Sequence, residues 1–183
     1  MTLAFRNRQR TRPLNLPLLR RVTRHLLQEE WKVASYELCF HFVEPEEMAK
    51  VNWQFLQHEG STDVITFDHS EFGAPGIARP GPSSSSKPSD AQRSSSANLL
   101  HGEIFISVTD AVKQAREFKT TWQSELVRYV IHGLLHLRGY DDLQPALRRV
   151  MKREENRLLK AVAKEFPAAV RASPLTRHPS TRR

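Results

Sequence analysis

The segment Ile131–Asp142 (IHGLLHLRGYDD) constrains the fold of this chain more than any other stretch. His132 and His136 stand four apart in an apolar, helix-forming run, so both imidazoles lie on one face of a helix, one turn apart. Gly139 can end that helix with a positive φ, which residues with a Cβ resist. The chain can then turn back, so that Asp142 brings a carboxylate oxygen to the two rings. Two nitrogens and one oxygen are typical of a catalytic zinc site, which keeps one position for water.

The two carboxylates after the glycine leave the third ligand open. Asp141 and Asp142 could instead cap the next helix, which is the commoner role of an aspartate near a helix start. The spacing favours Asp142 as the ligand and leaves Asp141 to support a ligand or the turn. His132 and His136 could also be ordinary core or surface histidines, because a short motif often matches by chance.

The same HxxxHxxGxxD spacing binds zinc in the metzincin peptidases, so a peptidase is one interpretation of the segment. Those enzymes need a glutamate directly after the first histidine, where it acts as the general base. Here that position is Gly133, which has no side chain. The sequence therefore argues against a metallopeptidase.

Hydrophobic periodicity around this segment predicts one α+β domain over residues 1–163, with a small sheet of about four strands packed against helices. The metal site would lie on a late helix and on the turn that follows it. We expect strands at 3–6, 35–43, 62–67 and 99–108, and helices at 18–31, 45–57, 109–118, from Thr121 or Ser124 through the two histidines, and 145–163.

Two segments are not expected to fold. Residues 70–98 hold four prolines, two serine runs and few large apolar residues. Such a segment buries too little surface to offset the entropy lost on ordering, so we predict a flexible insertion. Residues 164–183 are basic and contain further prolines, which predicts a disordered tail.

Overall composition restricts the partners and the compartment. The formal charge of +8 indicates a polyanionic partner, although basic tails alone can produce that balance. Cys39 is the only cysteine, which excludes an internal disulfide and favours a reducing compartment. No apolar run approaches the roughly 20 residues that a membrane helix needs, so no membrane partner is expected.

Several polar residues outside the motif could support the site or bind substrate. Thr62 and Asp63 open a strand next to the predicted insertion, although a turn is the simpler role for Asp63. His58 precedes them beside an acidic residue, and each remaining histidine is expected on the surface. The arginines of the first helix form either a solvated face or a phosphate-binding one.

Three further segments carry a resemblance to a known family. Met48–Asn52 followed by Thr62–Phe67 (TDVITF) is similar to the asparagine helix and TDVLSF strand of the YbeY-type bacterial endoribonucleases of ribosomal RNA maturation. His101–Ser107 (HGEIFIS) resembles that family's LGDIVIS strand. His132–Asp142 resembles its HGxLHLxGYDH signature, in which glycine follows the first histidine.

The resemblance spans Leu3 to about Leu159 and implies both a site and an activity. It implies one zinc-type ion per chain, bound in that family by three histidines, of which His132 and His136 match the first two. It also implies metal-assisted hydrolysis of phosphodiesters in small-subunit (16S-type) ribosomal RNA and a part in ribosome quality control. The partners would be ribosomal RNA and the small subunit. Because the first strand and helix belong to the matched domain, we expect a cytoplasmic protein rather than one with a cleaved presequence.

The chain departs from the family at two positions. Asp142 replaces the third histidine, which keeps a zinc ligand but adds a negative charge that disfavours an approaching phosphate. Leu56 stands where the family carries an arginine thought to serve cleavage, four residues after Asn52, so a phosphate-binding guanidinium is missing. The sequence thus predicts a zinc-dependent endoribonuclease, with a non-cleaving ribosome assembly or RNA-binding factor as the alternative.

Overall fold

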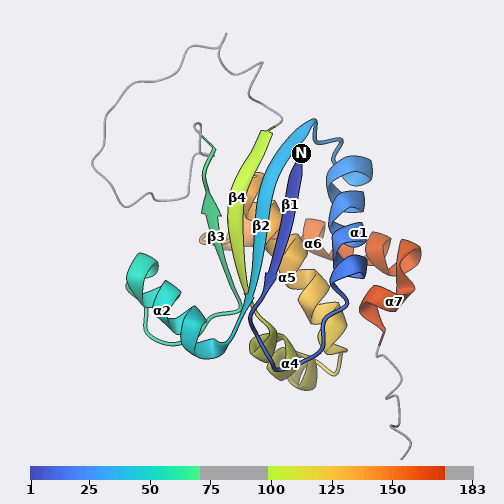
Figure 1. The fold of residues 1–183 in the computed structure, drawn as a ribbon. Coiled ribbons are helices and arrows are strands. Elements are labelled where there is room, and N and C mark those ends of the chain that lie inside the picture. The colour runs from blue at the N-terminus through green and yellow to red at the C-terminus, as the bar shows by residue number, and fades with distance from the viewer. Residues whose placement is uncertain (71–98, 172–183) are drawn as a thin grey trace, which may run out of the picture.

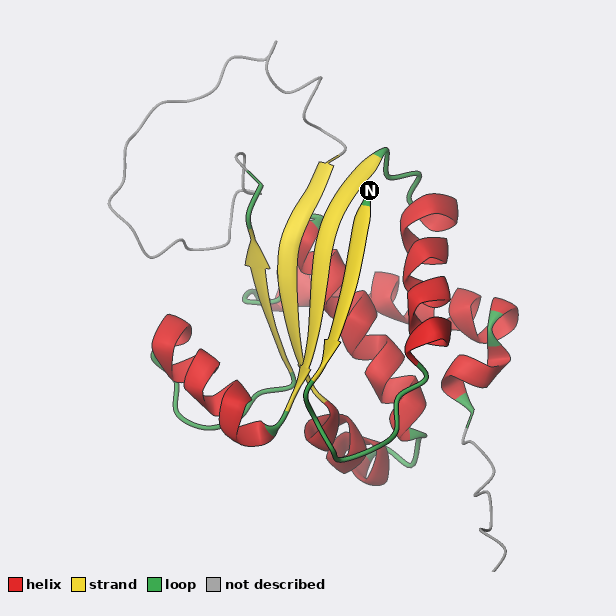
Figure 2. Cartoon of the chain, in the orientation of Figure 1, coloured by secondary structure: helices red, strands yellow, loops and turns green. Residues whose placement is uncertain are grey.

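A four-stranded mixed sheet forms the centre of the computed structural model, which describes residues 1–70 and 99–171 (Figures 1 and 2). The strand order is β1-β2-β4-β3. The first three strands in that order are parallel, and β3 pairs antiparallel to β4 at the sheet edge. The strands are β1 (Thr2–Asn7), β2 (Ser35–Val43), β3 (Val64–Asp68) and β4 (Leu99–Ser107).

Most of the helices cover one face of this sheet. Figures 1 and 2 show α1, α5, α6 and α7 gathered on one side, with α2 apart from them beside β3. This arrangement confirms the predicted α+β class. No helix within the described ranges is long and apolar enough to cross a membrane. The helices are α1 (Leu16–His25), its π-helical continuation η1 (Leu26–Glu30), α2 (Pro45–Leu56), α4 (Val108–Glu117), α5 (Trp122–Leu137), α6 (Pro145–Glu165) and α7 (Pro167–Val170).

Strand β2 is buried on both faces near its C-terminal end. Its even-numbered side chains, including Phe40 and Phe42, enter the main core beneath the helices. His41 faces the other way but is only 4% exposed, so its expected surface position was wrong. Phe105 of the neighbouring strand stacks on the imidazole, with ring centroids 4.3 Å apart, and Arg8 Nη2 lies 3.5 Å from Nδ1. Burial lowers the pKa of His41.

The fold also differs from the predicted boundaries at two places. Ser107 caps α4, because its Oγ accepts a hydrogen bond from Asp110 N at 3.2 Å, so the expected cap at Thr109 or Asp110 was wrong. At the other end, the chain stays folded beyond residue 163. Phe166 packs edge-on against His25 and Ala169 is buried, which places residues 164–170 in the fold. The predicted insertion from residue 71 and the tail from residue 172 lie outside the described residues.

Two glycines, Gly133 on α5 and Gly102 on β4, lie where α5 packs on the sheet. A Cβ on Gly133 would lie 2.6 Å from Cγ2 of Ile104 on β4. A Cβ on Gly102 would lie 2.5 Å from the Phe67 carbonyl oxygen and 2.7 Å from Cδ2 of Leu137. Neither position has space for a side chain. This contact fixes the depth and rotation of α5, and with them the direction of its histidines.

We expect Gly133→Ala to lower the free energy of unfolding by about 1–3 kcal/mol, because the added methyl group overpacks the α5–β4 contact. Urea denaturation measures the loss. The double variant Gly133→Ala/Ile104→Ala removes the clashing side chain, so the glycine substitution should cost less in that background. An equal cost in both backgrounds would show that the contact with Ile104 is not the cause.

Candidate metal centre

Local signals at both ends of α5 place the two histidines. Thr121 caps the start of the helix, where its Oγ1 accepts a hydrogen bond from Ser124 N at 3.1 Å. Gly139 ends it with φ of 85°, as the sequence predicted. Gly139 N donates to the His136 carbonyl at 2.9 Å, and Tyr140 N donates to the Leu135 carbonyl at 3.0 Å. These bonds satisfy the last carbonyls of the helix and turn the chain back toward the imidazoles.

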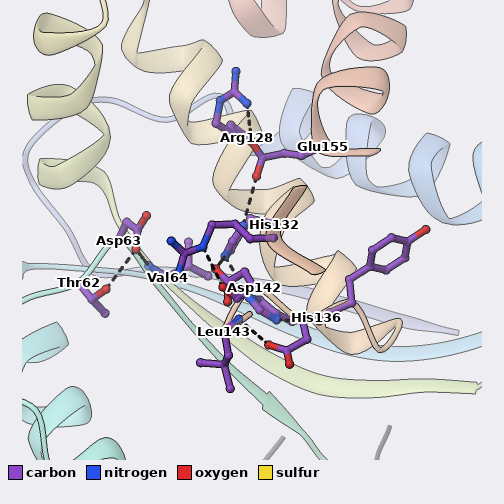
Figure 3. A network of polar contacts seen from close by, with 12 residues as sticks. Thr62, Asp63, Val64, Arg128, His132, His136, Asp142, Leu143 and Glu155 are labelled. Atoms are coloured by element: carbon purple, nitrogen blue, oxygen red, sulfur yellow. Dashed lines mark hydrogen bonds and ion pairs between the residues drawn. The ribbon is translucent and has the colours of Figure 1, made fainter. Parts of the chain in front are cut away.

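The two imidazoles face each other through Nε2 (Figure 3). Their Nε2 atoms lie 3.0 Å apart. Each Nδ1 faces an acceptor, which is Glu155 Oε2 at 3.2 Å for His132 and the Tyr140 carbonyl oxygen at 3.1 Å for His136. An Nδ1 that donates a hydrogen bond leaves Nε2 with a lone pair in a neutral ring. The hydrogen bonds therefore aim two lone pairs at one point.

Asp142 brings a carboxylate to the same point. Its Oδ2 lies 3.9 Å from His132 Nε2, and the three ligand atoms of His132, His136 and Asp142 all lie within 4.8 Å of one another. Two facing lone pairs beside a carboxylate repel unless a cation lies among them. Two nitrogens about 2.0–2.1 Å from one tetrahedral zinc ion would be roughly 3.3 Å apart, close to the separation here. The donor set thus fits a zinc-type ion.

A buried ion pair supports His132 from behind. Glu155 on α6 is 5% exposed and accepts hydrogen bonds from both His132 and Arg128 Nη1. Burial opposes its charged form, but these two bonds outweigh the burial and hold the pKa of Glu155 below its usual range. Arg128 also donates to Asn156 Oδ1 at 2.9 Å and lies 3.4 Å from a carboxylate oxygen of Glu125. A carboxylate behind a metal-binding histidine fixes its orientation and makes it more basic.

Glu155 was not among the residues predicted from the sequence, although α6 carries a signal for it. Glu155 occupies the apolar stripe of that helix, between Met151 and Leu158, where a carboxylate needs a buried partner. Arg128 stands one turn before His132, on the same face of α5 as both histidines. A cation there should have suggested that this face meets an acidic group.

His136 is partly buried on α5. Burial, and next the neighbouring His132, lower its pKa below that of a free imidazole. The ring is therefore neutral near neutral pH, which is the form that binds a metal.

The other predicted site residues have local contacts. Asp141 Oδ1 accepts a hydrogen bond from Leu143 N at 2.9 Å, which shapes the turn between α5 and α6. Asp63 Oδ1 accepts from Thr62 Oγ1 at 3.1 Å and from Val64 N at 3.0 Å. Tyr129 lies on α5, one turn before the first histidine. Burial raises the pKa of Tyr129, and the negative charge of Asp63 raises it further.

Two residues that bear on cleavage lie on or after α2. His58 is exposed in the loop after that helix and is not among the three ligand residues. Leu56, at the C-terminal end of α2, is 49% exposed. Its apolar side chain offers no donor to a phosphate.

The packing of α5 also removes the peptidase alternative. That chemistry needs a glutamate at position 133, but even a Cβ there would lie 2.6 Å from Ile104. The residue after the first histidine points into the sheet and not toward the ligand atoms. No general base can stand at this position.

Comparisons with known proteins agree with the fold and with the motifs of the sequence. The family described as Endoribonuclease YbeY matches residues 4–163. A protein named Endoribonuclease YbeY from Salinibacter ruber is 32% identical over 152 residues, which cover 83% of this chain and 86% of the relative. One from Chlorobium phaeovibrioides is 30% identical over 161 residues, 87% and 90% of the two chains. A solution structure from Thermotoga maritima shares the fold, with a TM-score of 0.54 at 21% identity, and covers 97% of this chain and 100% of its own.

Asp142→Ala should reduce the metal content from about one ion per chain to well below that value, because a metal site weakens when a ligand is removed. Elemental analysis after dialysis against zinc measures the content. Asp141→Ala is the matched control, since it removes the adjacent carboxylate and should leave the content unchanged. Full occupancy in Asp142→Ala would contradict this choice of the third ligand.

Glu155→Ala should weaken zinc affinity about 10–100-fold, because His132 loses the acceptor that orients it. Glu155→Gln keeps an oxygen acceptor and should lose less. Chelator competition measures the affinity. The control is Glu154→Ala, which removes a neighbouring carboxylate of α6. Glu154 pairs with Arg157 and not with His132, so this variant has the same change in net charge. A similar loss in Glu154→Ala would argue against a specific role for Glu155.

Proposed function

This chain belongs to the YbeY endoribonuclease family, and we propose that it is a zinc-dependent enzyme that hydrolyses phosphodiester bonds in precursors of small-subunit ribosomal RNA. The main observation in favour of a zinc ion is that the Nε2 atoms of His132 and His136 face each other, 3.0 Å apart. The Asp142 carboxylate beside them completes a donor set of two nitrogens and one oxygen. Such a set leaves one position of a tetrahedral ion for water or substrate.

Two sets of contacts orient the histidines of this site. Glu155 and the Tyr140 carbonyl hold the two Nδ1 protons and so keep both Nε2 atoms free for a metal. Arg128 neutralises Glu155 and keeps it ionised within the core. A zinc ion held there would supply Lewis acidity, polarise a phosphoryl oxygen and make a water molecule acidic near neutral pH.

Charge favours RNA as the partner. The formal net charge of +8 gives salt-dependent attraction to a polyanion. We therefore propose ribosomal RNA and the small ribosomal subunit as the partners, and the cytoplasm, where bacterial ribosomes mature, as the compartment.

A specific observation favours a second candidate, a ribosome assembly factor that binds RNA without cleaving it. Leu56 is an exposed apolar side chain where the family resemblance places an arginine. The substitution removes a guanidinium that would clamp a phosphate through two hydrogen bonds. In such a factor the metal would hold the α5–α6 turn in place.

Incubation of the zinc-loaded and the EDTA-treated protein with ribosomal RNA precursor and with casein tests these candidates. We expect cleavage of RNA by the zinc-loaded protein only, restored when zinc is returned to the EDTA-treated sample and abolished in His136→Ala. Casein should remain intact. RNA binding without cleavage in every sample would support the assembly factor and overturn the enzyme.

A further inference from the structure

The solvent face of α6 carries a stripe of cations. Arg149, Arg153, Lys160 and Lys164 follow one another at spacings of four, seven and four residues, so they lie along one side of the helix. All four are exposed, and they stand opposite the buried face formed by Met151, Glu155, Leu158 and Val162. The stripe is about 22 Å long at 1.5 Å per residue.

These four cations have no carboxylate partner within the described ranges. Two of the three acidic residues of the same helix are engaged elsewhere, since Glu155 binds Arg128 and His132, and Glu154 binds Arg157. Arg157 itself also pairs with Glu30. Two of the three arginines of α1 differ, because the guanidinium groups of Arg20 and Arg21 lie over aromatic rings of the protein. Positive charge is therefore left free on α6.

The near end of this helix is tied to the metal ligands. Arg148 Nε donates a hydrogen bond to the Asp142 carbonyl at 2.9 Å, and Glu155 bonds His132 two turns later. Exposed Lys152 stands between these two positions, one turn from each. A polyanion that lies along α6 therefore passes the ligand cluster at one end.

We propose that the solvent face of α6, with Arg149, Arg153, Lys160 and Lys164 at its centre, is a docking surface for single-stranded RNA. Charge complementarity selects the partner, because an unpaired row of arginine and lysine side chains matches a run of phosphates. Arg148 and Lys152 lead from this row to the ligand cluster. The inference rests on the proposed endoribonuclease function and names the surface that presents the RNA to that site.

The test compares zinc-loaded wild type with the variant Arg149→Gln/Arg153→Gln/Lys160→Gln/Lys164→Gln. Glutamine has nearly the helix propensity of arginine and lysine, so α6 should stay folded, with unchanged circular dichroism and zinc content. The probe is a labelled single-stranded RNA of about 16 nucleotides, and a denaturing gel checks that it is intact after the binding measurement. We expect roughly tenfold or greater weakening of Kd, and a salt slope of log K smaller by about 0.7 for each phosphate that the variant no longer neutralises.

The matched control removes four exposed cations elsewhere, in Arg6→Gln/Arg24→Gln/Arg116→Gln/Lys119→Gln, and should weaken RNA binding far less. Equal weakening in the two variants would overturn the surface and leave only an effect of net charge. Unchanged RNA binding in the α6 variant, together with abolished binding to polyglutamate, would overturn it in favour of an acidic protein partner. Cleavage of precursor RNA by wild type is measured in parallel. Specific binding through α6 without cleavage would contradict the proposed enzyme and keep the surface.

Discussion

The close contact of α5 with β4 is the constraint on which the site depends. Gly133 and Gly102 let the helix lie against the sheet, where a Cβ at either position would meet neighbouring atoms at 2.5–2.7 Å. With its position and rotation fixed in this way, α5 directs His132 and His136 toward α6 and the turn that precedes it. The same glycine that excludes a peptidase base therefore aims the two histidines of the candidate metal site. A signature that looks purely chemical in the sequence is partly a packing requirement.

The orientation of His132 also depends on an ion pair between α5 and α6. Arg128 and Glu155 form a buried ion pair, and burying such a pair is costly unless each member has further hydrogen bonds. Here both members do, since Glu155 also accepts from His132 and Arg128 also donates to Asn156. Through this bond to Glu155, the pair holds the His132 imidazole in one orientation. This fits a site in which the nitrogens must converge before any metal binds.

The sequence predicted the α+β class, the helix that carries both histidines, and its end at Gly139, because periodicity and glycine chemistry are local. Predictions from the sequence were wrong or missing where the burial of a residue depends on segments distant along the chain. His41 is covered by Phe105, and Ala169 is buried six residues beyond the predicted domain end. Glu155 was missed for the same reason, since its partners lie 23 and 27 residues away on another helix. A polar residue inside an apolar stripe indicates a buried partner but does not say which one.

The aspartate at position 142 raises the question of whether the site still attracts a phosphate. A carboxylate ligand adds a negative charge that histidine would not, and Leu56 supplies no compensating cation. Arginines that contact the candidate ligands or their partners lie on α5 and α6 instead. Arg148 is hydrogen-bonded to the backbone of Asp142 itself, and Arg128 offsets the charge of Glu155. Since Arg128 is paired with Glu155 and Glu125, the positive charge left for a phosphate at this centre comes from Arg148 on α6 rather than from α2. An RNA strand would then approach across α6, and the leucine at position 56 would lie outside the part of the surface that binds phosphate.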